Sequence, residues 1–106
     1  MDNKLTLQLL LPVQRELEEI AQIYMELAGP ESARRITDRI YTALDKLLTF
    51  PNMDVSCRDK RLAADGYRML ICDNYLCFYR LIGDTIFVYH IADGRANYPK
   101  LFSDLY

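Results

Sequence analysis

The hydrophobic residues near the start of the chain first alternate and then take a helical spacing. Leucines stand at every second position from Leu5 to Leu11, which is the period of a β-strand. Pro12 suits the first turn of a helix, where its missing N–H is not needed. The apolar positions that follow, at steps of three and four, are Val13, Leu17, Ile20, Tyr24 and Leu27. We therefore expect a short strand followed by an amphipathic helix.

A second helical stripe follows directly. Gly29 is suited to ending the first helix, and Pro30 is suited to opening the next one. The apolar positions of this second stripe are Ala33, Ile36, Ile40, Leu44, Leu47 and Leu48. Phe50-Pro51 ends the pattern. Because only Gly29 and Pro30 separate the two helices, they should fold back on each other as an antiparallel hairpin.

The second half of the chain is rich in β-forming residues. Residues 51–66 are polar and show no clear period, so we expect an irregular connection there. Three β-rich runs follow at residues 67–72, 75–82 and 85–92. Asp73-Asn74 and Gly83-Asp84 separate them, and both pairs are typical of tight turns. The order β-α-α-β-β-β predicts a single α+β domain over residues 1–106, with a helical hairpin packed on a mostly antiparallel sheet.

Both faces of the predicted sheet are largely apolar. With two-residue turns, strand alternation gives one face Arg68, Leu70, Cys72, Tyr75, Cys77, Tyr79, Leu81, Ile86, Val88, His90 and Ala92. The other face receives Tyr67, Met69, Ile71, Leu76, Phe78, Arg80, Ile82, Thr85, Phe87, Tyr89 and Ile91, and one bulge would exchange part of the two sets. The helical hairpin can cover only one face, and a face open to solvent should alternate to polar residues. We therefore expect the C-terminal tail or a partner protein to cover the second face.

Charge and cysteine content limit the kinds of partner and metal site that the chain can have. The formal net charge is -2 and the pI is about 5.3, which argues mildly against nucleic acid as the main partner but does not exclude a local basic site. Cys57, Cys72 and Cys77 lack the spacing of a zinc or redox motif, and the chain has one histidine. We expect reduced thiols, no metal and no cofactor. With no signal peptide or membrane span in the sequence, we expect a cytoplasmic protein.

Several short motifs occur in a specific order. The second half contains Gly66-Tyr67-Arg68-Met69-Leu70-Ile71, then Asn74-Tyr75-Leu76-Cys77-Phe78-Tyr79-Arg80, then Gly83-Asp84, and finally Gly94-Arg95 with Tyr98. The first half adds a strand, Pro12, Leu17-Glu18-Glu19-Ile20, Ala33-Arg34-Arg35-Ile36 and Phe50-Pro51. In this order the motifs resemble the RelE/ParE superfamily, the toxins of bacterial type II toxin–antitoxin systems. The resemblance covers nearly the whole chain.

This resemblance implies a fold, a partner and two alternative targets. The family has the β-α-α-β-β-β fold, and its members arrest growth until a cognate antitoxin wraps them with a helix and an extended arm. ParE-like toxins poison DNA gyrase, whereas RelE-like toxins are metal-independent endoribonucleases (mRNA interferases) that cut messenger RNA in the ribosomal decoding site. Because one fold hosts both activities, fold alone does not choose between them, and a degenerate, non-catalytic binding module is a third alternative. A homodimer or a heterotetramer with the antitoxin is compatible with the resemblance.

The resemblance also indicates candidate catalytic residues. RelE-like enzymes cleave RNA with a cluster of Lys, Arg and Tyr side chains, which must activate the 2′-OH and stabilise charge on phosphorus. Arg68 stands where such enzymes carry a basic residue, and Arg95 and Tyr98 stand where they carry an arginine and a tyrosine. His90 is a weaker candidate. Gly94 should allow a sharp bend that turns Arg95 out of the sheet.

Other positions depart from the RelE-like pattern. Leu70 and Leu76 occupy sites where basic groups are expected, Asp93 replaces a common histidine, and Ala96 replaces a common arginine. Few of the residues that a RelE-like nuclease needs are therefore present, and the pI is acidic. Both features favour ParE-like action on a protein target.

Structural roles compete with catalysis for the remaining candidates. Arg68 can pair with a carboxylate or stack on Tyr79, and Arg80 can make a cation–π contact near Tyr67 and Phe87. His90 can be a hydrogen-bonded histidine of the sheet. Arg95 and Tyr98 therefore have the stronger functional case, because the end of a strand presents side chains to partners.

Overall fold

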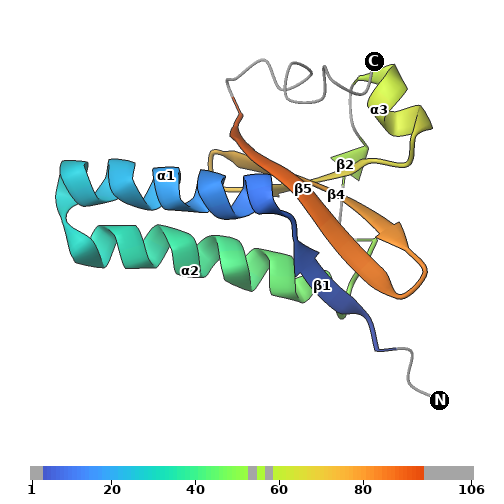
Figure 1. Ribbon diagram of the computed structural model, residues 1–106, viewed down its shortest axis with the longest axis horizontal. Helices are drawn as coiled ribbons and strands as arrows, with labels where there is room; N and C mark the ends of the chain where they lie inside the picture. The colour runs from blue at the N-terminus through green and yellow to red at the C-terminus, as the bar shows by residue number, and fades with distance from the viewer. Residues whose placement is uncertain (1–3, 53–54, 57–58, 95–106) are drawn as a thin grey trace.

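The computed structural model describes residues 4–52, 55–56 and 59–94 (Figure 1). The elements follow in the order β1 (Thr6–Leu9), α1 (Leu11–Ala28), α2 (Pro30–Lys46), β2 (Val55–Ser56), α3 (Lys60–Ala64), β3 (Arg68–Cys72), β4 (Tyr75–Ile82) and β5 (Thr85–Asp93). The predicted order β-α-α-β-β-β is confirmed. The stretch that we expected to be irregular contributes two further short elements, β2 and α3. No helix in the described residues is long and apolar enough to cross a membrane.

The sheet has five strands in the order β1-β5-β4-β3-β2. Strand β1 runs parallel to β5, and the other neighbours are antiparallel. Cys72 pairs with Tyr75 and Ile82 pairs with Thr85, so both predicted two-residue turns are confirmed. Asp73 and Gly83, the first residues of these turns, have positive φ angles of 53° and 60°.

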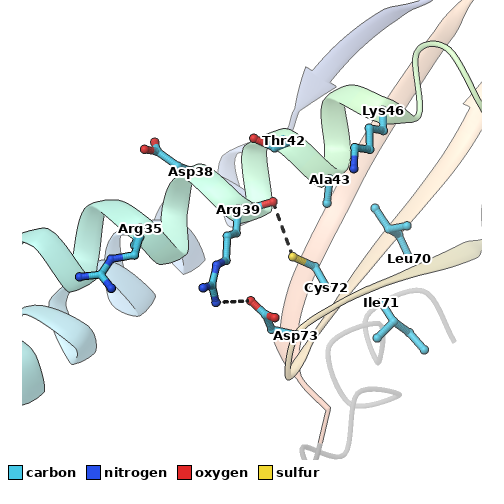
Figure 2. A pocket seen from close by; sticks show the side chains of 10 residues that line it. All are labelled: Arg35, Asp38, Arg39, Thr42, Ala43, Lys46, Leu70, Ile71, Cys72 and Asp73. Carbon is cyan, nitrogen blue, oxygen red and sulfur yellow. Dashed lines mark hydrogen bonds and ion pairs between the residues drawn. The ribbon is translucent and has the colours of Figure 1, made fainter.

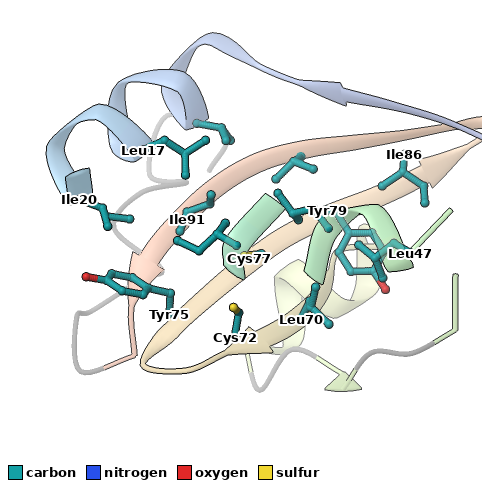
Figure 3. Packing of buried hydrophobic residues seen from close by; sticks show 14 of the residues in the cluster. Leu17, Ile20, Leu47, Leu70, Cys72, Tyr75, Cys77, Tyr79, Ile86 and Ile91 are labelled. Atoms are coloured by element: carbon teal, nitrogen blue, oxygen red, sulfur yellow. The ribbon is translucent and has the colours of Figure 1, made fainter. Parts of the chain in front are cut away.

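The helical hairpin lies on one face of the sheet (Figure 1). Its sharp reversal centres on Gly29, whose φ of 90° disfavours residues with a Cβ. The buried stripes of both helices pack with strand residues to form the main core (Figure 3), which consists of Val13, Leu17, Ile20, Ile36, Ile40, Leu44, Leu47, Leu70, Cys72, Tyr75, Cys77, Tyr79, Ile86, Val88 and Ile91. Leu27 was expected in this stripe, but it is 77% exposed. It lies in the last turn of α1, at the tip of the hairpin that extends away from the sheet (Figure 1).

A bulge in β5 changes the predicted sides of two residues. Phe78 pairs with His90 and Tyr79 pairs with Val88, which leaves Tyr89 as an extra residue on β5. After this point, the alternation of β5 side chains between the two sheet faces is shifted by one residue. Ile91 therefore packs in the core beneath the helices and Ala92 packs in the cluster on the other face, which reverses the predicted assignment.

The chain itself covers part of the second face. Leu62 of α3 is 1% exposed and packs in a second cluster with Tyr67, Met69, Phe78 and Ala92. Asp59 caps the helix, because its Oδ1 accepts hydrogen bonds from the backbone N–H groups of Arg61 (2.9 Å) and Leu62 (3.1 Å). We expected this cover from the tail or from a partner. The tail from residue 95 onward lies outside the described residues, and α3 is a source of cover that we did not predict.

Candidate functional site

Arg68 anchors the connection that leaves α2. Its guanidinium donates hydrogen bonds to Asn52 Oδ1 (3.0 Å) and to the Pro51 carbonyl (3.4 Å). The hydroxyl of Tyr79, the neighbour of Arg68 on β4, donates to the same carbonyl (3.2 Å). The half-buried Arg68 therefore holds residues 51–52 against the start of β3. These two partners are amide and carbonyl oxygens. The expected pairing of Arg68 with a carboxylate or with the Tyr79 ring stays a prediction.

Arg80 lies between two tyrosine rings on the second face. Its guanidinium carbon is 4.7 Å from the centre of the Tyr67 ring and 5.0 Å from that of Tyr89. It also donates to the Tyr89 hydroxyl (2.9 and 3.2 Å) and to the Asp65 carbonyl (3.3 Å). The hydrogen bonds to Tyr89 raise the pKa of Arg80 further above its usual value, and burial raises the pKa of Tyr67. The arginine therefore has the expected cation–π role, with Tyr89 as its second ring.

His90 is paired with a carboxylate from α1. Its Nδ1 lies 2.9 Å from Glu16 Oε2, and the other oxygen of Glu16 accepts a hydrogen bond from the Ile91 backbone N–H (2.8 Å). Both side chains are mostly buried. Because β1 pairs with β5 only as far as Val88, Glu16 supplies an acceptor to the strand edge beyond that point. This arrangement favours a structural role for His90, in which it ties α1 to β5.

Arg95 and Tyr98 lie outside the described residues. The chain reaches them through Gly94, whose backbone N–H donates to the Asn74 carbonyl at 2.7 Å. A Cβ at position 94 would lie 3.2 Å from that oxygen, so the close approach of the backbone favours glycine. The described part of the chain therefore ends where the β3–β4 turn and the end of β5 come together.

The two described cysteines are free thiols in the main core. Burial raises the pKa of both groups, and it raises that of Cys77 to about 12. Because the thiolate is the reactive form, these thiols should be inert at neutral pH. Cys57 lies outside the described residues.

A groove of about 880 Å³ lies between α2 and β3 (Figure 2). Its lining residues are Arg35, Asp38, Arg39, Thr42, Ala43 and Lys46 from α2, and Leu70, Ile71, Cys72 and Asp73 from β3 and the turn after it. We did not predict a site on this side of α2 from the sequence. The available signal was the spacing of Arg35, Arg39 and Lys46 by four and seven residues, which places three cations on one side of a helix.

Comparison with known proteins gives a consistent result. The family model described as the ParE toxin of the type II toxin–antitoxin system parDE matches residues 7–98. A solved structure of the chromosomal ParDE system from P. aeruginosa has a chain 20% identical to this one, with a TM-score of 0.73 over 87% of this chain and 98% of that chain. The toxin–antitoxin complex RelBE2 from Mycobacterium tuberculosis has a chain 16% identical, with a TM-score of 0.64 over 85% and 98%. No significant match is found among curated proteins.

The two structural matches demonstrate a shared fold, since their sequence identities are low. The family match is more specific, because it spans most of the chain. It includes the helical hairpin, all three strands of the antiparallel meander, and Arg95 and Tyr98. The chain therefore belongs to the ParE toxin family of type II toxin–antitoxin systems.

Proposed function

We propose that this toxin inhibits growth by acting on a protein target such as DNA gyrase, and that a cognate antitoxin neutralises it. One observation favours a protein target over RNA cleavage. Both arginines on the described parts of β3, β4 and β5 already contact other residues of the protein. Arg68 binds residues 51–52, and Arg80 lies between Tyr67 and Tyr89. Metal-free RNA cleavage requires cationic or acidic groups that are free to meet the phosphate and the leaving oxygen. These two arginines would have to leave structural contacts to do so.

Exposed apolar side chains support the antitoxin part of the proposal. Large hydrophobic residues at the surface include Leu11, Ile23, Met25, Leu27, Tyr41, Phe50, Ile71, Leu81 and Ile82. Several belong to the hairpin and others to the sheet, so they mark more than one surface. Exposed apolar patches are typical of proteins that function in complexes. The solved relatives, which come from ParDE and RelBE2 systems, agree with such a partner.

Arg95 and Tyr98 are our candidates for the contact with the target. They follow the end of β5, and their engagement with a protein surface would require no catalytic cluster. Arg68 and His90, the other candidates from the sequence, have contacts that favour structural roles. A target such as gyrase would place the toxin in the cytoplasm.

The target can be tested in cells that express the toxin without its antitoxin. We expect growth to stop and the DNA-damage response to rise, while abundant messenger RNAs stay intact by primer extension. The comparison strain carries the same vector with a stop codon early in the toxin gene. Cleavage of messages within the reading frame, without DNA damage, would support the RelE-like alternative. Normal growth at confirmed soluble expression would favour a degenerate binding module.

A further inference from the structure

Strand β5 continues beyond the strand that pairs with its outer edge. Strand β1 follows β5 only as far as the pair of Leu9 with Val88, and the Leu10 N–H donates to the Val88 carbonyl at 3.1 Å. Within the described residues, no other strand pairs with that edge along residues 89–93. The backbone groups of this stretch therefore need partners from elsewhere, because a buried N–H without an acceptor is costly.

Glu16 of α1 supplies such a partner. Its Oε1 accepts a hydrogen bond from the Ile91 N–H at 2.8 Å, and its Oε2 lies 2.9 Å from His90 Nδ1. The next residue of α1, Leu17, packs in the same core cluster as the Ile91 side chain (Figure 3). Only 19% of the Glu16 side chain is exposed. Because a hydrogen bond to a carboxylate is strong, one side chain anchors two consecutive residues of β5 to α1.

The end of β5 is also held on its other edge. Tyr75 at the start of β4 pairs with Asp93. The Gly94 N–H donates to the Asn74 carbonyl at 2.7 Å. The last residues of β5 are therefore fixed from two sides, by the β3–β4 turn on one edge and by Glu16 on the other.

We propose that Glu16 is a positioning residue for the contact with the target. It fixes the end of β5, and Arg95, our candidate target residue, comes one residue after β5 and Gly94 in the sequence. Without the carboxylate, the strand end would be anchored on one edge only. A contact made from a less defined starting point then carries a larger entropic cost. The inference rests on the proposed function, because it needs a target contact at Arg95 and Tyr98, but it does not depend on which molecule the target is.

Hydrogen exchange tests the anchor itself. Exchange of the backbone amides around Ile91 is measured by mass spectrometry on the complete toxin. We expect E16A to speed this exchange about tenfold, because the Ile91 N–H loses its acceptor. E16Q should keep the slow exchange, since its amide oxygen can still accept this hydrogen bond. E19A is the matched control, because Glu19 is exposed on the same helix, and it should exchange like the wild type.

Growth inhibition tests the consequence of the anchor. Each variant is expressed without antitoxin, and the soluble amount that halves the growth rate is determined. We expect E16A to require about ten times more toxin, whereas E16Q and E19A should match the wild type. Antitoxin affinity should change less than about twofold in all three, because the buried carboxylate offers little surface to a partner. I40V controls for a general loss of stability, since Ile40 is fully buried in α2. It should melt at a lower temperature and stay toxic.

Unchanged growth inhibition by E16A would overturn the proposal, because the anchor would then be structural only. An equal loss of toxicity in E16A and I40V would do the same, since general instability would explain both. Slow exchange around Ile91 in E16A would show that Glu16 does not hold the strand. A wild-type toxin that leaves growth unaffected would overturn the proposed function and the positioning role with it. The hydrogen-exchange result, which needs no target, distinguishes that failure from a failure of the anchor.

Discussion

Arg68 and Arg80 are the same residue type on neighbouring strands, and their surroundings give them different roles. The cation–π role of Arg80 could be predicted from the aromatic residues on its face, although its second ring is Tyr89 and not the expected Phe87. The hydrogen bond from Arg68 to Asn52 could not be predicted. Asn52 is 16 residues away in the sequence, and its position depends on the path of the chain after α2. The surroundings of Arg95 and Tyr98 stay predictions from the sequence.

The buried thiol of Cys77 should make the protein less stable in alkali. Its pKa is raised from 9.0 to about 12 in the folded state, so between these values the unfolded chain loses a proton that the folded chain keeps. Stability from this group is complete below pH 9 and falls above it, by up to about 1.4 kcal/mol per pH unit. The free energy of unfolding, measured by urea titration at pH 7 and pH 10, should fall less in C77A than in the wild type. Equal decreases in the two proteins would contradict this role for the thiol.

Replacement of Arg95 should separate toxicity from folding. If Arg95 contacts the target, R95A should relieve growth inhibition while the melting temperature and antitoxin binding stay nearly unchanged, because an exposed arginine contributes little to stability. K100A, which removes another cation from the same tail, is the control and should stay toxic. If R95A instead melts at a lower temperature and stays toxic in proportion to its soluble amount, Arg95 is part of a structural ion pair.

At the scale of elements, α3 and the bulge in β5 are the features that periodicity did not reveal. The helices and main strands follow long apolar patterns, so their order and both tight turns could be predicted. A five-residue helix is too short to show a period, although Asp59 as a cap and the isolated Leu62 were available signals. A bulge depends on how two strands twist against each other, which the alternation within one strand does not record.

Leu62 should be essential for the cover of the second face. Truncation of a fully buried leucine leaves a cavity, so L62A should lower the free energy of unfolding by about 2–4 kcal/mol. L27A is the matched control, because Leu27 is largely exposed and its truncation should cost less than about 0.5 kcal/mol. Denaturant unfolding of both variants provides the comparison. Equal effects would mean that α3 does not pack on the sheet as described.

At the scale of the whole molecule, the protein has a covered core but retains exposed apolar surface. Helix α3 covers part of the second sheet face, yet Ile71 and Ile82 stay at the surface together with Leu27 and Phe50. The doubly apolar sheet could be predicted from alternation. Which part of it meets a partner could not, because that depends on where α2, α3 and the sheet edges lie in space.

The isolated chain should therefore associate, and co-expression with its antitoxin should prevent this. Burial of apolar surface in the complex removes the driving force for self-association. Size-exclusion chromatography with light scattering should show oligomers or aggregates for the toxin alone and one defined complex with the antitoxin. A monodisperse monomer without the antitoxin would mean that the exposed residues are too dispersed to drive association.

The most direct test of the account is the supercoiling activity of purified DNA gyrase in the presence of purified toxin. The proposed function predicts that the toxin inhibits supercoiling in a concentration-dependent manner and that prior mixing with antitoxin restores it. A toxin denatured and held unfolded before addition serves as the control. Full gyrase activity at toxin concentrations that stop growth in cells, together with cleavage of ribosome-bound messenger RNA by the same preparation, would contradict the account.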